Sequence, residues 1–183
     1  MEMLSDLDFT PQEYLAWERE AETKSEYVKG AVYVMSGAKV AHNRISVNLI
    51  AAVHGQLKDR PCEVFGSDMR VWVDAAESYF YPDLSGLCGE VDFTDDTRDT
   101  YENPQFIIEI LSDSTESFDR GQKFLFYQEI DSLKEFVLVA QNRMVIELYR
   151  KVEGVWNYWS FQSSKDILDL QSVGCQVPLE EIY

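Results

Sequence analysis

The stretch QFIIEILS, residues 105–112, is a continuous apolar run that contains a single charged residue, Glu109. A second run, YFYPDLSGLCGE at residues 79–90, also reads as a buried strand, yet it has Pro82 and Asp83 in its middle. An ionised carboxylate is costly to bury, so each acid needs a cation, several hydrogen bonds or a proton as its partner. Proline also marks strand edges and bulges, so Asp83 could simply sit at a kink. The two acids are therefore either unfavourable residues that the fold tolerates or functional residues that the two strands hold in place.

The whole chain, residues 1–183, is predicted to form one domain of the α/β or α+β class, with a mixed sheet flanked by helices. Hydrophobic residues make up 45% of the sequence, and the Tyr, Phe and Trp residues fall mainly in strand-like stretches. No internal repeat, linker or low-complexity tract interrupts the pattern.

Local signals place the elements along the chain. Thr10, Pro11 and Glu13 form a capping-box signature at the start of a helix. The later helix at 114–130 carries Phe118, Phe124, Leu125 and Tyr127, which are expected to pack on the sheet. Helices are predicted at 10–20, 41–59 and 114–130; a hairpin at 25–37 with its turn at Lys29-Gly30; strands at 66–74, 79–88, 105–111 and 133–141; a closing hairpin at 144–161 with its turn at Glu153-Gly154; and a solvated acidic loop at 90–104.

The formal net charge is −17, with a pI near 4.4. This charge repels polyanions, so it counts against nucleic acid binding unless basic residues are locally focused or cations intervene. The acidic N-terminal stretch and the lack of a long apolar run predict a soluble, cytoplasmic protein that is not exported. Cys62, Cys88 and Cys175 show no paired metal spacing, and three reduced thiols are expected.

Asp83 and Glu109 lie 26 residues apart, on strands that could be neighbours. Two carboxylates side by side are unfavourable without a counter-ion, and Mg²⁺ or Mn²⁺ is the natural one because hard cations take oxygen ligands. A metal held in this way can activate water and stabilise charge on a phosphate. The alternative is that each acid is paired with a nearby arginine or lysine.

The order of these residues resembles a known pattern. Pro-Asp on one strand, Glu on the next and a helix carrying Lys123 resemble the PD-(D/E)XK nuclease superfamily, whose members hydrolyse phosphodiesters. More closely, the chain resembles the restriction endonucleases proposed for the Uma-two family, formerly a domain of unknown function. The likeness runs over nearly the whole length, through EYVKGAVYVMSGAKVAHNRISVNL, YPDLSGLCGE, EILSDSTESFDRGQKFLFYQ and LKEFVLVAQNRMVIELYR. It implies a restriction-endonuclease-like core and a magnesium-dependent endonuclease that acts on DNA.

The resemblance also implies roles for single residues. Asp83 and Glu109 would be the metal ligands, with the backbone carbonyl of Ile110 as a third. The superfamily lysine should stand two residues after the glutamate, where this chain has Leu111, so Lys123 of the following helix is expected to supply the basic group. The competing interpretation of Lys123 is a surface ion pair with Asp119, four residues earlier in the helix.

Five further residues have weaker expectations. Glu26 matches a family position where an acid approaches the site as a catalytic or second-metal residue, although a solvated acid at a hairpin is the simpler interpretation. His42 is left outside the core site. Asp113 stands where the family commonly has proline and is expected to cap the following helix. Arg70 and Arg120 are candidates for phosphate contacts or for pairing with acids.

Two functions from different classes follow from the sequence. The first is a metal-dependent endodeoxyribonuclease, for which a homodimer is expected because cutting both strands with single-site subunits calls for two copies. The second is a catalytically inactive nuclease-fold module that binds a basic protein, which the missing strand lysine and the negative charge favour. A glycosidase with paired carboxylates is weaker, since only Tyr79 and Tyr81 flank the acids as sugar-stacking aromatics.

Overall fold

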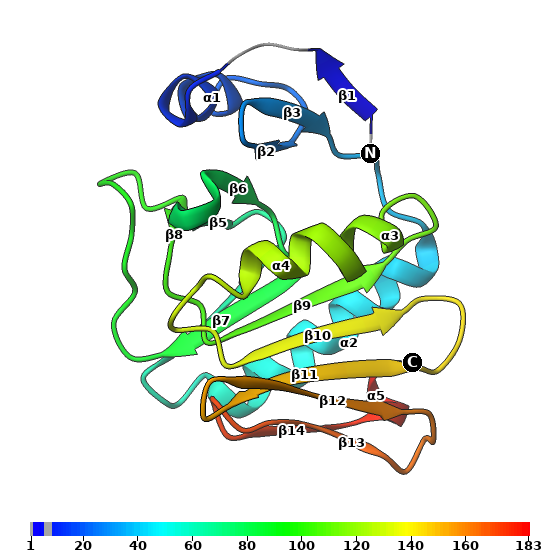
Figure 1. Cartoon of the computed structure of the whole chain (residues 1–183). Coiled ribbons are helices and arrows are strands. Elements are labelled where there is room, and N and C mark those ends of the chain that lie inside the picture. Colours follow the sequence, from blue (N-terminus) through cyan, green and yellow to red (C-terminus); the bar gives the residue numbers. More distant parts are fainter. Residues whose placement is uncertain (1, 6–8) are drawn as a thin grey trace.

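The computed structural model describes residues 2–5 and 9–183. Two six-stranded sheets dominate the fold, one lying above the other, with helices between and beside them (Figure 1). Among the described residues, no helix is both long enough and apolar enough to cross a membrane. The predicted class, a mixed sheet flanked by helices with added hairpins, is confirmed.

The lower of the two sheets, called the central sheet here, carries the apolar strand that contains Glu109. Strands β9 and β10 are parallel, and every other neighbouring pair is antiparallel. In spatial order its strands are β12 (Val155–Phe161), β11 (Ile146–Val152), β10 (Glu135–Ala140), β9 (Phe106–Leu111), β7 (Leu84–Cys88) and β4 (Cys62–Gly66).

The second sheet, called the upper sheet here, contains the first predicted hairpin. The short helix α1 (Pro11–Glu18) packs on it through an aromatic cluster that includes Tyr14, Tyr27 and Tyr79. In spatial order its strands are β1 (Glu2–Ser5), β3 (Ala31–Val34), β2 (Ser25–Val28), β6 (Ser78–Phe80), β5 (Arg70–Val73) and β8 (Thr100–Tyr101), and a 3₁₀ turn, η1 (Asp74–Ala76), links β5 to β6.

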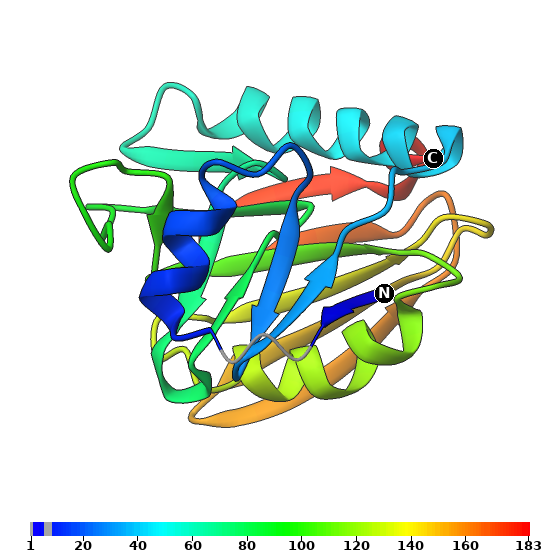
Figure 2. The ribbon, with the colours of Figure 1, turned by 90° about the horizontal axis from the view of Figure 1, so that it is seen from above.

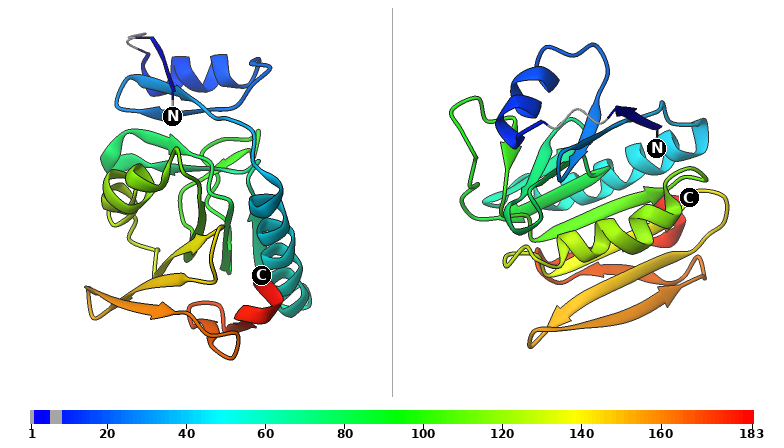
Figure 3. Two further views of the ribbon diagram at one scale, coloured as in Figure 1. Left: turned by 90° about the vertical axis from the view of Figure 1, so that its right-hand side faces the viewer. Right: turned by 45° about the horizontal axis from the view of Figure 1, so that its top comes forward.

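Different elements cover the two faces of the central sheet (Figures 2 and 3). One face is covered by the long helix α2 (Val40–Leu57), the hairpin β13 (Ile167–Leu170) and β14 (Cys175–Pro178), and the terminal helix α5 (Leu179–Ile182). The other face, toward the upper sheet, is covered by three consecutive helical segments, α3 (Glu116–Phe118), the π-helical turn η2 (Asp119–Lys123) and α4 (Phe124–Tyr127). Each face has its own apolar core, so β9 is buried on both sides.

Several local predictions are confirmed. The side chain of Thr10 accepts a hydrogen bond from the Glu13 backbone, and the Glu13 carboxylate accepts one from the Thr10 backbone, which completes the capping box. Lys29 and Gly30 form the hairpin turn, both with positive φ. Helix α2 and the closing hairpin also form where the sequence predicts them.

The predicted strand at 79–88 is wrong as one element. Strand β6 ends at Phe80 in the upper sheet and β7 begins at Leu84 in the central sheet, so residues 81–83 carry the chain from one sheet to the other. The apolar character of the run reflects burial in both sheets. Pro82 and Asp83 therefore lie at a bend between two strands, which is where a residue without a backbone N–H is tolerated.

Three other local expectations are corrected. The predicted strand at 66–74 is shorter, and the separate strand β4 precedes it. Leu125 is exposed, because it lies on the solvent side of α4. The acidic loop is more than a solvated connection: its Asp99 binds both Arg19 and the buried Arg70, which ties the loop to the upper sheet.

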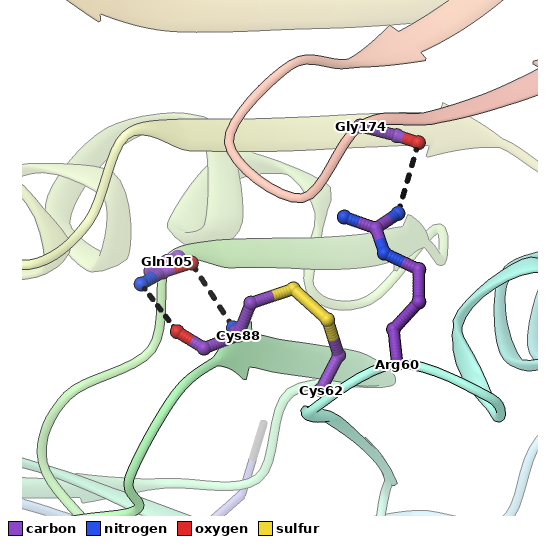
Figure 4. Close-up of a disulfide and its surroundings, with 5 residues drawn as sticks. All are labelled: Arg60, Cys62, Cys88, Gln105 and Gly174. Atoms are coloured by element: carbon purple, nitrogen blue, oxygen red, sulfur yellow. Dashed lines mark hydrogen bonds between the residues drawn. A yellow bond between two sulfur atoms is a disulfide. The ribbon is translucent and has the colours of Figure 1, made fainter.

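The expectation of three reduced cysteines is also wrong. Cys62 on β4 and Cys88 on β7 form a disulfide (Figure 4). The two residues stand directly opposite each other in the antiparallel register, and the backbone of Cys88 bonds the side chain of Gln105 on its other side. The pair is therefore of the non-hydrogen-bonded kind, in which opposite side chains are closest. Only the register of these two strands brings the sulfur atoms together.

Thiol titration tests this pairing. Under denaturing, non-reducing conditions we expect one free thiol per chain, Cys175, whose pKa burial raises to about 11 and which therefore stays protonated in the native protein. Replacing both Cys62 and Cys88 by serine should destabilise the fold by about 3.5 kcal/mol, from loop-closure entropy over a separation of 26 residues. The Cys175→Ser variant should titrate to zero thiols, and three thiols in the unmodified chain would contradict the disulfide.

Candidate active site

A pocket of about 620 Å³ lies where the upper sheet, the beginning of α2, the end of β9 and the turn η2 meet. Its lining contains every residue for which the sequence predicts a role in catalysis or metal binding: Glu26, Asp83, Glu109, Ile110 and Lys123. These five residues come from four different segments of the chain. The fold therefore brings the predicted set together at one place.

Asp83 reaches the site from the bend between the two sheets. The register of β7 on β9 pairs Leu84 with Ile108, so two residues further along it would set Pro82 opposite Ile110. Proline has no N–H to donate, and the ladder ends there. Instead, the backbone N–H of Ile110 donates to Oδ2 of Asp83 at 2.7 Å.

The carbonyl of Ile110 shares this edge of β9. The N–H and C=O of one strand residue point to the same side of the strand. The Ile110 carbonyl therefore also faces the side of β9 on which β7 lies, beyond the last residue pair of the two strands. Ile110 contributes to the pocket lining. Pro82 thus explains both features: the strand pairing stops before it, and the Asp83 carboxylate lies beside a backbone carbonyl that has no β7 partner within residues 9–183.

Glu109 lies one residue earlier in β9 and points to the face covered by η2 and α4. Its Oε1 is 2.8 Å from Nζ of Lys123 and accepts a hydrogen bond from the Tyr127 hydroxyl at 3.0 Å. Burial raises the pKa of Glu109 well above its usual value, opposed by Lys123 and reinforced by the acids Asp119, Asp83 and Glu26. No hydrogen bond to the second oxygen, Oε2, occurs within residues 9–183, so that oxygen is free to take another partner.

Lys123 is held between two acids. Its Nζ lies 2.8 Å from Oε1 of Glu26 and 2.8 Å from Oε1 of Glu109, and only 3% of the residue is exposed. Burial alone would lower the pKa of Lys123, but Glu109 and Glu26 raise it well above its ordinary value, so the ammonium stays charged. Asp119 is 3.8 Å away, which makes the helical ion pair a minor contact of an inward-facing lysine.

The position of Lys123 follows from which residues occupy the face of β9 that carries Glu109. Leu111, at the usual lysine position, lies on the same face of β9 as Glu109 and packs into the core beneath α4. The helical segments above that face provide the lysine instead. Lys123 ends the π-helical turn η2, a local widening that is frequent at functional sites.

Glu26 is buried on β2, with 2% of its surface exposed, so the interpretation as a solvated hairpin acid is wrong. Its Oε1 accepts from Lys123 and from the backbone N–H of Tyr81 at 3.2 Å. These contacts place one strand of the upper sheet against the bend that carries Asp83. Glu26 acts here as a partner of the lysine.

Sequence reasoning missed three residues of the pocket region. His42, from the first turn of α2, has Nε2 3.2 Å from Oδ1 of Asp83, and this hydrogen bond raises the pKa of its imidazole. Tyr127 holds Glu109, and Asp119 lines the pocket as a further carboxylate whose pKa burial raises. The four-residue spacing of Asp119, Lys123 and Tyr127 could have indicated that Asp119 and Tyr127 lie near the site with Lys123, because residues at this spacing share one face of a helix.

The remaining expected residues have other partners. Arg70 is buried against Thr100, Tyr81 and Asp99, and Arg120 binds Glu116 and Glu147. Neither arginine lines the pocket, and both are paired with polar or acidic groups. Asp113 lies at the pocket rim and pairs with Lys39 at 3.3 Å. The hydrogen bond expected from Asp113 at the helix start is made by the side chain of Ser112, which accepts from the Thr115 backbone.

The donor set decides which cation could fit. In the part of the chain that the structure describes, no three His, Cys, Asp or Glu side chains converge at ligating distances. Two carboxylates and a carbonyl are a donor set that fits Mg²⁺, which is usually bound through one or two carboxylates and keeps several water molecules.

Comparison with known proteins places the chain in a family. Residues 11–180 match the Uma2 family, described as "Putative restriction endonuclease". The chain belongs to this family. Two proteins from Synechocystis sp. (strain ATCC 27184 / PCC 6803 / Kazusa) are similar to this chain, both named as uncharacterised proteins. The first, sll1609, is 42% identical over 143 residues, 78% of this chain and 81% of the relative; the second, slr1290, is 35% identical over 175 residues, 95% and 90% of the two chains.

A solved structure has the same fold. The crystal structure of a putative nuclease belonging to DUF820 from Anabaena variabilis ATCC 29413 superposes with a TM-score of 0.78 and covers 95% of this chain and 97% of its own. Sequence identity is 16%, so this likeness is one of architecture. The Uma2 chain described here therefore has the nuclease-like fold that its sequence motifs imply.

The buried cluster around Lys123 makes a stability prediction. Lys123→Met leaves Glu26 and Glu109 buried without their cation, and removal of one partner from a buried ion pair costs about 3–5 kcal/mol. We expect that loss in urea unfolding. Combining Lys123→Met with Glu26→Gln and Glu109→Gln should recover much of it, because the buried charges are removed together.

Lys165→Met, at an exposed position, is the matched control and should change stability by less than about 0.5 kcal/mol. A Lys123→Met protein as stable as the parent would contradict the buried cluster, as would a triple variant no more stable than the single one.

Proposed function

We propose that this Uma2 protein is a magnesium-dependent endonuclease that hydrolyses phosphodiester bonds of DNA. One observation carries the proposal: the pocket contains more carboxyl groups than it has cationic side chains to balance them. Glu26, Asp83, Glu109 and Asp119 provide four carboxylates, whereas Lys123 provides one ammonium. If all four carboxylates are ionised and His42 is protonated, four negative charges less two positive ones leave an excess of two, which a divalent cation would neutralise. Without such a cation, burial raises the pKa of Glu109 and of Asp119, so that protons offset part of this charge.

The residues that would hold this cation are Asp83, Glu109 and the carbonyl of Ile110. When bound there, Mg²⁺ would lower the pKa of a water molecule and offset the charge that develops on a phosphate. The free Oε2 of Glu109 and the edge of β9 at Ile110 support this assignment. The contacts from His42 and from Tyr127 orient the two carboxylates without covering all of their lone pairs.

Lys123 would supply the fixed positive charge of the reaction. Its ammonium is pre-oriented by Glu26 and Glu109, so it needs no reorganisation when an attacking water loses its proton or when charge builds on the phosphate. Glu26 would act as a positioning residue through this lysine. This role replaces the second-metal role, because its Oε1 is already bound by the ammonium and by the Tyr81 backbone.

A polyanionic substrate must still approach an acidic protein. Lys24 and Lys39 line the pocket, but they are paired with Asp68 and Asp113, so the rim adds little net positive charge. DNA cleavage should consequently depend on divalent cations for approach as well as for chemistry. The same acidity favours the second candidate, an inactive module that binds a basic protein.

Substitution of the two acids tests the activity. Asp83→Asn and Glu109→Gln should each abolish Mg²⁺-dependent cleavage of plasmid DNA, a loss of at least about 100-fold, because each removes a charged ligand. Both should also weaken Mn²⁺ binding measured by calorimetry in the absence of DNA. Circular dichroism should show that both variants remain folded.

Glu63→Gln provides the control, since Glu63 is an exposed strand acid of the same sheet, outside the pocket. It should cleave DNA and bind Mn²⁺ like the parent. Full cleavage by the Asp83 and Glu109 variants would refute the assignment of the site. An unmodified protein that neither binds Mn²⁺ at millimolar concentration nor cleaves DNA, but captures a basic protein, would favour the binding module.

A further inference from the structure

Strand β12 is the outer edge of the central sheet and is the most exposed of its strands (Figure 3). Among the described residues, β12 pairs with β11 alone. Its apolar side chains nonetheless face solvent: Val155 is 63% exposed, Tyr158 54% and Trp159 40%. Val155 and Trp159 project from one face of the strand and Tyr158 from the other, so exposed apolar side chains flank the open edge on both faces.

The backbone of β12 also has unused hydrogen-bonding groups at regular intervals. In β11 the backbone N–H of Lys151 donates to the carbonyl of Lys134, on the side of β10. The backbone groups of the next residue, Val152, therefore point to the other side, toward β12. Val152 pairs with Val155 across the two-residue turn Glu153-Gly154. Because backbone direction alternates along a strand, every second residue from Val155 faces β11. The N–H and C=O groups facing the open edge belong to Trp156, Tyr158 and Ser160.

The strand lacks the features that usually protect an edge. The sequence VWNYWSF contains no charged residue and no proline, and the register with β11 runs through seven residue pairs without a bulge. The opposite edge strand of the same sheet, β4, differs: it is shorter, carries Glu63, and lies against α2. The two edges of the central sheet are therefore not equivalent.

We propose that β12 pairs antiparallel with β12 of a second copy of this chain, with the two-fold axis passing through Tyr158. In this register Tyr158 faces its own counterpart, and Trp156 of each copy faces Ser160 of the other. All six residues are ones whose backbone groups point to the open edge, so the register satisfies every unused donor and acceptor of the strand. On the opposite face of the joined sheet, Val155 meets Phe161 and Asn157 meets Trp159.

Charge identifies a second copy as the occupant. Two molecules that each carry −17 repel each other over most of their surface, and a strand without charge is where they approach at the lowest cost. Antiparallel pairing of a strand with its own copy also gives a closed dimer, because each copy contributes the same strand to the two-fold interface. A basic protein would instead be expected at an acidic surface, and β12 has no acid to offer it.

Cysteine cross-linking tests the register. Tyr158→Cys should form a covalent dimer on mild oxidation, because Cα atoms directly opposite in a hydrogen-bonded antiparallel pair are about 5.5 Å apart, within disulfide reach. Val155→Cys is the matched control on the same strand. It should stay monomeric on a denaturing gel, because six residues of strand, about 20 Å, separate the two copies of position 155 in this register. The buried Cys175 does not compete.

Sedimentation equilibrium tests the interface itself. The unmodified protein should be a dimer, and Tyr158→Lys should be a folded monomer, because it sets two ammonium groups against each other at the axis. Val47→Lys, at an apolar position of α2 that is also 63% exposed, should remain dimeric.

A monomeric parent protein would overturn the proposal, as would a Tyr158→Lys dimer or equal cross-linking at positions 155 and 158. If the parent is monomeric and binds an oligothymidylate that the Tyr158→Lys variant does not bind, the exposed aromatics are a stacking surface for single-stranded nucleic acid instead.

Discussion

The ammonium of Lys123, enclosed between Glu26 and Glu109, is the interaction on which the arrangement of the site depends. It joins three parts of the fold: β2 of the upper sheet, β9 of the central sheet and the π-helical turn η2 between them. A buried lysine is tolerated only with such partners, and the acids in turn need the lysine. The cluster therefore fixes how the upper sheet sits over the central sheet, and it positions the charges of the pocket at the same time.

The bend at Pro82 and Asp83 provides the second constraint. Pro82 has no N–H to donate to the Ile110 carbonyl, and the pairing of β7 with β9 ends where the chain leaves for the upper sheet. The carboxylate of the next residue, Asp83, accepts the hydrogen bond from the Ile110 N–H. This exchange brings a carboxylate to the end of a buried strand without leaving the backbone donor of Ile110 unpaired. His42 supports the same carboxylate from α2, so a loop residue is held from two sides. Residues that take part in chemistry need such support, because small displacements of reacting groups slow reactions greatly.

Much of the fold and part of the site could be predicted from local patterns. The capping box at Thr10, the turns at Lys29-Gly30 and Glu153-Gly154, and the apolar spacing of α2 are all encoded within a few residues, and all are confirmed. Asp83, Glu109 and Lys123 were recognisable because charged residues are rare inside apolar runs and because their order matches a family. The cysteine pairing was not predictable in this way, since Cys62 and Cys88 are joined only by the register of β4 on β7. The competing interpretation of Glu26 as a solvated hairpin acid fails for the same reason: nothing near it in the chain indicates that the helical turn at Lys123 covers it.

The amino-acid sequence by itself determined the capped first helix, the long helix α2 and the two hairpin turns, and it placed two acids where burial would make them costly. Tertiary structure alone decided what those acids meet. It divided one apolar run between two sheets, turned Lys123 inward and set His42, Tyr127 and Asp119 around the same pocket. The physical reason is that periodicity and capping act over a few residues, whereas ion pairing and strand register depend on side chains that lie tens of residues apart and meet only after the sheets have packed.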